Sequence, residues 1–167
     1  MLTNDALREE EATFEQEDNE HPVPPTDVVA YNELRSCADL FRMYVSKNLE
    51  IQPDFQRETV WKQEDKWRFI DSLVKQLPIP SMCFSLDHKK QKWKVIDGLQ
   101  RMESIIKFLS DDEWRLGDLK DIHPGLRNIT NLILRYGTED QRKLYTMVQD
   151  MSIPLTVIRC DYSKKIT

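Results

Sequence analysis

The stretch VIDGLQRMES, residues 95–104, decides how the fold is predicted. An apolar run ends at Asp97-Gly98, and a different pattern begins at Leu99. From there apolar residues recur at the i, i+3, i+4 and i+7 spacing of one buried helix face: Met102, Ile105, Ile106 and Leu109. The sequence therefore predicts a strand over 92–96 that turns directly into a helix over 99–109.

A helix that begins in this way has features of an anion site. Its first N–H groups lack partners and carry a partial positive charge of about +0.5, and phosphate is the usual anion bound there. Gly98 would let the backbone approach a ligand. Gln100 and Arg101 fall in the first turn, and the fork of donors on an arginine suits phosphate oxygens. A plain Asp-Gly turn with a helix cap remains an alternative.

The acid before this glycine would not favour a bare phosphate. Asp97 fits the site if it holds a metal ion, orients a water molecule or fixes an arginine. A second stretch, QPDFQR at 52–57, repeats the pairing of an acid with Gln-Arg. We therefore expect Arg57 and Arg101 to converge on one polyanion, with Asp54 as a second candidate metal ligand.

The pattern on either side indicates helices and strands in alternation. Ser36 and Thr138 are suited to cap helices, because a short polar side chain can accept from a free N–H group there. We expect the fold class to be α/β or α+β, with a small mixed sheet flanked by helices. The expected helices span 36–49, 63–77, 99–109, 126–137 and 138–150, and the expected strands span 27–31, 81–86, 92–96, 153–160 and a short piece of 112–119.

Charge and composition divide the chain in two. Residues 1–27 are acidic, poor in large apolar residues and end in a proline cluster, so we expect an acidic N-terminal arm. This arm either keeps the protein in solution or lies on a basic anion site. Residues 28–167 are expected to form one folded domain. The formal net charge of −5 argues against a general nucleic-acid binder.

The three cysteines are Cys37, Cys83 and Cys160, and none forms a C-x-x-C pair. This pattern favours buried free thiols in a reducing cytoplasm over zinc or disulfide chemistry. No apolar run has the length of a membrane span, so no membrane partner is expected. The only compact basic stretch, HKKQKWK at 88–94, is either an exposed hairpin tip or a contact for DNA phosphates.

Several of these stretches together resemble a known family. IQPDFQRETVWKQEDKWRFIDSLVKQLPIPSMCFSL (51–86), WKVIDGLQRMESIIKFL (93–109) and IPLTVIRC (153–160) resemble the N-terminal domain of GmrSD-type restriction endonucleases. The resemblance implies a ParB/sulfiredoxin-like fold. The family usually has Asp-Gly-Gln-Gln-Arg where this chain has Leu99 in the third position, so one glutamine of the motif is replaced.

The resemblance implies a module that binds and hydrolyses a nucleoside triphosphate and so controls the cutting of foreign DNA. In such proteins a separate His-Asn-His nuclease domain makes the cut. Here the histidines His21, His88 and His123 are scattered, so we expect the nucleotide module alone, truncated before further helices and a nuclease. DNA would then be contacted only through missing or partner domains. The sequence leaves open whether the chain forms a homo-oligomer.

Roles for individual residues follow as hypotheses. Arg57 and Arg101 would neutralise the phosphates. Asp97, with Asp54, would hold Mg²⁺ or orient the attacking water. Gln100 would position water or phosphate oxygens.

The remaining members of the expected nucleotide site are Gln56, Gly98 and Leu99. Catalysis is assigned to Asp97 and Gln100 with the two arginines. Two other functions stay open: a nucleotide-sensing switch without hydrolysis, which the replaced glutamine favours, and a DNA-binding module.

Overall fold

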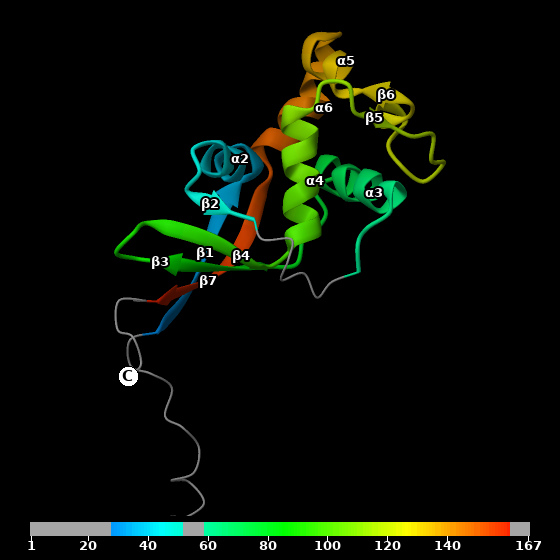
Figure 1. The fold of residues 1–167 in the computed structure, drawn as a ribbon. Coiled ribbons are helices and arrows are strands. Elements are labelled where there is room, and N and C mark those ends of the chain that lie inside the picture. Colours follow the sequence, from blue (N-terminus) through cyan, green and yellow to red (C-terminus); the bar gives the residue numbers. More distant parts are fainter. Residues whose placement is uncertain (1–27, 52–58, 161–167) are drawn as a thin grey trace, which may run out of the picture.

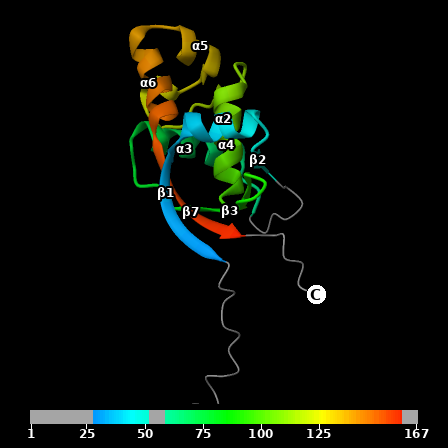
Figure 2. The ribbon, with the colours of Figure 1, turned by 90° about the vertical axis from the view of Figure 1, so that its left-hand side faces the viewer.

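The computed structural model describes residues 28–51 and 59–160. They form a mixed five-stranded sheet with strand order β1-β7-β3-β4-β2, and a small second sheet of β5 and β6. The helices α2, α3, α4, α5 and α6 lie on one side of the larger sheet (Figures 1 and 2). The elements are β1 (Val29–Ser36), α2 (Cys37–Val45), β2 (Leu49–Glu50), α3 (Gln63–Val74), β3 (Met82–Asp87), β4 (Lys92–Asp97), α4 (Leu99–Ser110), β5 (Arg115–Leu116), the 3-10 helix η2 (Pro124–Leu126), β6 (Ile129–Thr130), α5 (Asn131–Tyr136), α6 (Glu139–Asp150) and β7 (Ser152–Cys160).

The sheet joins segments from the two ends of the folded region. β1 pairs antiparallel with β7, and β7 pairs parallel with β3. β3 and β4 form the expected hairpin, and the two-residue β2 pairs parallel with β4. The mixed sheet flanked by helices confirms the predicted α/β class.

One face of the sheet carries the core. Along β3 the residues alternate, so that Met82, Phe84 and Leu86 are buried under the helices while Cys83, Ser85 and Asp87 lie on the other face. Full burial of such a side chain contributes about 1.5–3 kcal/mol relative to exposure. The same core takes the buried stripes of β7 and α4: Ile153, Leu155, Val157, Met102, Ile105 and Phe108.

Two helix caps expected from the sequence are confirmed. Ser36 Oγ accepts from Asp39 N at 3.1 Å at the start of α2. At the start of α6, Thr138 Oγ1 accepts from Gln141 N at 3.3 Å, and Gln141 Oε1 accepts from Thr138 N at 2.8 Å. The reciprocal pair at α6 is a capping box.

Four expectations about lengths and faces were wrong. Helix α2 ends at Val45 instead of residue 49, and Leu49–Glu50 form β2. The first strand runs to Ser36 instead of ending at 31, because it pairs with β7 along its whole length. Helix α3 ends at Val74 instead of residue 77, and Leu77 is 47% exposed. Gln76 has φ 54°, and Leu77 N donates to Ser72 O at 3.0 Å, which is the backbone pattern of a Schellman turn. Ile106 is half-buried and packs against the core from its edge.

The stretch 110–137 is held to the core by a buried acid. Asp71 on α3 accepts from His123 N at 2.7 Å through Oδ1 and pairs with Lys75 at 2.6 Å through Oδ2. His123 Nδ1 accepts from Gly125 N at 3.0 Å, so the imidazole caps the 3-10 helix η2. The short strand expected within 112–119 is β5, and the expected helix over 126–137 contracts to α5, which Gly137 follows.

The cysteines differ in burial. Cys37 is fully buried, and desolvation raises the pKa of its thiol to about 12. Cys83 and Cys160 are only half-buried, which corrects the expectation that all three would be inside. None of the helices in residues 28–51 and 59–160 combines the length and the apolarity that a membrane span requires.

Candidate functional site

The α4 junction, residues Asp97–Arg101, is the point where β4 turns into α4. Gly98 is the residue before the helix and has a left-handed backbone with φ 100°. A Cβ placed on Gly98 would lie 2.6 Å from Met82 Cγ. The turn and the packing on β3 therefore require a glycine, whatever the junction binds.

The start of α4 has no cap from a side chain. No side chain among the described residues accepts from its first turn, and that turn contains no acidic residue. Gly98 O accepts from Met102 N at 2.9 Å, as in any first turn. The N–H groups of Leu99, Gln100 and Arg101 are therefore left without a side-chain acceptor in the part of the chain that is described.

Gln100 is the most deeply buried polar group of the α4 junction. Only 1% of the residue is exposed to solvent, and its Oε1 accepts from Trp61 N at 3.0 Å. Its Nε2 is buried and has no hydrogen-bond partner among the described residues. Buried amide donors are normally paired, so this one needs an explanation. Through Trp61, Gln100 also fixes the residues that follow segment 52–58.

Arg101 lies at the mouth of the junction. Its side chain is 14% exposed, and Nη1 donates to Pro80 O. Nη2 lies 3.5 Å from Asp97 Oδ2, and the Asp97 side chain is 55% exposed. These contacts use two of the five guanidinium donors. Arg101 thus ties the Pro78–Pro80 turn to α4 and keeps donors for another partner.

The predicted site residues fall into two groups. The structure brings Asp97, Gly98, Leu99, Gln100 and Arg101 together at the junction, with 98–100 buried and the two charged side chains at the rim. Asp54, Gln56 and Arg57 lie outside the described residues. Their convergence with Arg101 stays a prediction.

Sequence reasoning missed the neighbours that shape the junction. Trp61 is half-buried and packs edge-to-face on Phe69, with ring centroids 5.6 Å apart. Cys83 pairs with Asp97 across β3 and β4. Burial, together with the charge of Asp97, raises the pKa of the Cys83 thiol. The raised pKa keeps the Cys83 thiol protonated to higher pH, and the thiolate is the nucleophilic form.

Metal ligands are sparse in this region. Within 28–51 and 59–160 no three side chains of His, Cys, Asp or Glu gather as a metal site. Asp97 is the one described acid at the junction. Magnesium in nucleotide sites commonly takes one or two carboxylates and completes its shell with phosphates and water.

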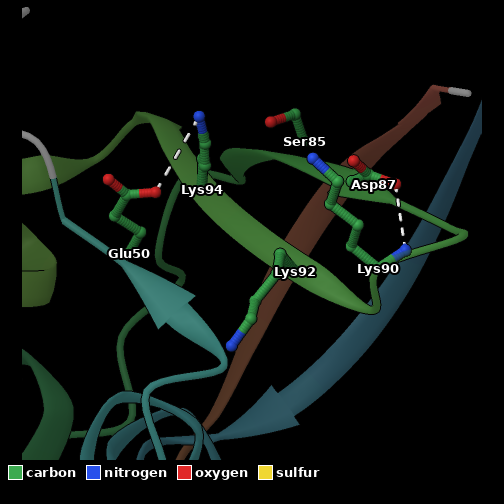
Figure 3. A pocket seen from close by; sticks show the side chains of 6 residues that line it. All are labelled: Glu50, Ser85, Asp87, Lys90, Lys92 and Lys94. Carbon is green, nitrogen blue, oxygen red and sulfur yellow. Dashed lines mark hydrogen bonds and ion pairs between the residues drawn. The ribbon is translucent and has the colours of Figure 1, made fainter. Parts of the chain in front are cut away.

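A second site lies on the open face of the sheet. The lysine pocket is a hollow of about 360 Å³ lined by Glu50, Ser85, Asp87, Lys90, Lys92 and Lys94 (Figure 3). The basic stretch 88–94 was noticed in the sequence, but its partners from β2 and β3 were not. The alternation of SMCFSLD could have indicated that Ser85 and Asp87 share the face of the lysines.

These features define a class of protein, a mixed α/β domain with an Asp-Gly-x-Gln-Arg junction between a central strand and a helix. The sequence model of the family described as GmrSD restriction endonuclease, N-terminal domain, matches residues 37–163. The chain belongs to this family, which confirms the resemblance. No curated protein and no solved structure matched the chain. The family places the chain in a restriction or defence protein.

Proposed function

We propose that the α4 junction binds the phosphates of a nucleoside triphosphate. The observation that carries the proposal is the buried Nε2 of Gln100, which has no partner among the described residues and lies at a helix start without a side-chain cap. A phosphate oxygen is the kind of acceptor that such N–H groups bind. The capped starts of α2 and α6 offer no comparable set of donors.

The charged rim supports the same ligand. Arg101 has donors left after its contacts to Pro80 and Asp97, and a guanidinium binds phosphate through two parallel bonds. The Asp97 carboxylate stands beside it, more exposed than the arginine. We propose that Asp97 orients the arginine and, with bound nucleotide, contributes a carboxylate to Mg²⁺. The metal would supply charge neutralisation at the phosphates.

The segment with the second Gln-Arg pair is tethered close to this site. Trp61 N is held 3.0 Å from Gln100 Oε1, and Arg57 is four residues before Trp61. Four residues span at most about 14 Å, a distance that is comparable to the size of a nucleotide. This tether supports our proposal that Arg57 and Gln56 bind the phosphates from the opposite side, with Asp54 as a further ligand of Mg²⁺. The proposed nucleotide site thus uses both Gln-Arg pairs.

Hydrolysis is the second part of the proposal. Water would attack the γ-phosphorus, the bond from this phosphorus to the β–γ bridging oxygen would break, and a nucleoside diphosphate would leave. Leu99 is buried but is not part of the contiguous core formed by the described residues. Position 99 thus lies within the junction and outside that core, and its change from the family's glutamine favours a slow enzyme or a switch that binds without turnover.

Membership in the family gives the module its context. We propose that nucleotide occupancy at the α4 junction controls the DNA cutting of other domains or partner chains in the cytoplasm. The ParB/sulfiredoxin-like fold remains part of this proposal. The described domain would then contact DNA only through those other parts.

A thermal-shift and calorimetric screen of the four NTPs, with and without Mg²⁺, tests binding. A nucleotide at 100 times its Kd should stabilise the protein by about 2.7 kcal/mol. Arg101→Lys should keep the charge and weaken binding about tenfold, because the fork geometry is lost. The matched control is Arg142→Lys on the exposed face of α6, which should bind like the wild type. Equal NTP affinity for both variants would refute the assignment.

A phosphate-release assay separates the enzyme from the switch. Leu99→Gln restores the family's usual motif, so it should raise turnover if position 99 serves hydrolysis. Binding without release in both proteins would leave the switch as the function.

A further inference from the structure

We infer that the acidic N-terminal arm, residues 1–27, binds in the lysine pocket of the same chain. The charges of the chain are segregated. The arm holds nine of the 29 acidic residues and one of the 24 basic residues, so its net charge is −8. The remaining 20 acidic and 23 basic residues leave 28–167 with a net charge of +3. The arm also lies outside the matched family range, 37–163, so it is an addition to the shared domain.

The lysine pocket presents ammonium groups around a buried hydroxyl. Lys90 comes from the turn between β3 and β4, Lys94 comes from β4, and Ser85 lies on β3 between them (Figure 3). Ser85 is 4% exposed and lines the pocket, and its hydroxyl makes no hydrogen bond to the described residues. A hydroxyl between two lysines suits a carboxylate, which accepts from all three.

The acids in the pocket do not cancel these charges. Glu50 pairs with Lys94 at 3.8 Å, and both side chains are about half exposed, so the pair is weak. Asp87 Oδ1 accepts from the backbone N of Lys90 at 3.1 Å and thereby shapes the turn. Lys92 turns away from Lys90, and its Nζ donates to Lys47 O at 3.0 Å (Figure 3). Lys90 and Lys94 are therefore the groups that a carboxylate would meet.

The strand order puts the arm close to the pocket. Val29 at the start of β1 lies opposite Arg159 on β7, and Arg159 lies opposite Leu86 on β3. The arm thus enters the sheet at the end where the β3–β4 turn projects. Two to three strand spacings separate β1 from β3 and β4, about 10–15 Å. The nine residues from Glu20 to Val29 span up to about 30 Å, so the acids of the arm reach the pocket.

Attachment to the same chain compensates for weak individual pairs. A short tether gives the arm an effective concentration in the millimolar range at the pocket. Exposed charge pairs are screened by salt, since the Debye length falls from about 30 Å at 0.01 M to about 3 Å at 1 M. The bound arm would keep other polyanions out of the pocket at low salt. This inference does not depend on nucleotide binding at the α4 junction.

Zero-length carbodiimide cross-linking of the full chain, followed by peptide mapping, tests the inference. We expect intramolecular links from Glu9–Glu20 to Lys90 and Lys94, with about fivefold fewer at 0.5 M than at 0.02 M salt. Lys120 is exposed and lies between β5 and β6, outside the larger sheet, so it serves as the internal reference. The triple variant Glu9→Gln, Glu10→Gln, Glu11→Gln should reduce the links to the pocket and leave those of Lys120 unchanged.

A second measurement uses a single-stranded DNA of about 12 nucleotides as a polyanion probe. The triple glutamine variant should bind this probe about tenfold tighter than the wild type, and adding Lys90→Gln and Lys94→Gln should remove the gain. Links spread evenly over all lysines, or links found only between two chains, would overturn the inference. Equal DNA binding at the pocket by the wild type and the triple glutamine variant would also overturn it, because nucleic acid would then be the occupant of the pocket.

Discussion

Helices α4 and α6 both have 12 residues, but they begin in different ways. Thr138 and Gln141 cap the start of α6 reciprocally, and Glu139 and Asp140 add negative charge to its first turn. The start of α4 has the left-handed Gly98, no side-chain cap among the described residues and no acid in the first turn. α6 thus satisfies its free N–H groups with its own side chains, whereas no described side chain accepts from the first turn of α4.

The two starts also differ in their surroundings. The cap at α6 is solvent-exposed, so water can replace either of its hydrogen bonds. At α4 the glutamine of the first turn, Gln100, is buried, and its Oε1 accepts from Trp61 N, 39 positions away. A local motif therefore stabilises one helix, and a long-range contact stabilises the other. This difference predicts which substitutions are costly.

The largest effect is expected at Gly98. Gly98→Ala forces a side chain into a left-handed backbone and against Met82, and it should lower the free energy of unfolding by about 3 kcal/mol. Urea unfolding measures the loss. Ser110→Ala, at the exposed end of the same helix, is the control and should change stability by less than about 0.5 kcal/mol. A loss below about 1 kcal/mol at Gly98 would show that the turn tolerates a side chain.

The next effect is expected at Gln100. Gln100→Met keeps the volume but leaves Trp61 N without its acceptor, so it should cost about 2 kcal/mol. Hydrogen exchange should show faster exchange of the Trp61 amide. The matched variant is Gln141→Met in the exposed cap of α6, which should cost about 1 kcal/mol or less. Equal losses at the two glutamines would remove the distinction between the two helix starts.

A smaller effect is expected at Thr138. Thr138→Ala removes the acceptor for Gln141 N and should cost about 1 kcal/mol, whereas Thr138→Gly should cost only a few tenths. Equilibrium unfolding of both variants measures the difference. An alanine variant as stable as the wild type would mean that water already serves this helix start.

The smallest effect is expected at α2 and depends on pH. Burial raises the pKa of Asp39, but hydrogen bonds from Arg42 and Arg35 outweigh it and lower the pKa overall. The carboxylate therefore stabilises the fold above its unfolded pKa of about 3.9, and this contribution is lost as pH falls through the lower folded pKa.

Asp39→Asn should consequently cost up to about 1 kcal/mol at pH 7, since the pairs are partly exposed. The difference from the wild type should shrink below about pH 4. Unfolding curves at both pH values test this. A difference that stays constant with pH would assign the loss to packing instead of charge.

Local patterns in the sequence predicted much of this structure. The helical spacing after Gly98, the caps at Ser36 and Thr138, and the β-branched run at 153–160 all describe interactions between near neighbours. Such interactions are readable because both partners lie within one turn or one strand. The family resemblance was likewise carried by short motifs in order, and the match over 37–163 confirmed it.

Errors arose where distant segments decided the outcome. β1 extends to Ser36 only because β7 pairs with it. The end of α3 is an exception, since a local backbone turn at Gln76 stops the helix before Leu77. The contact from Gln100 to Trp61 had no local signal. The sequence showed the lysines of the pocket as a basic stretch. It did not show that Ser85 lines the same pocket, because this depends on the pairing of β3 with β4.

The sequence by itself determined the order of helices and strands, the family and the residues at the α4 junction, because short-range spacing and capping follow from the chain's own chemistry. Only the tertiary structure decided that Gly98 packs too closely on Met82 for a side chain and that Gln100 keeps a buried donor. It also decided that the lysine pocket lies at the end of the sheet where the acidic arm joins. Those relations depend on strand order and on the packing of segments far apart in the chain, and no local pattern encodes them.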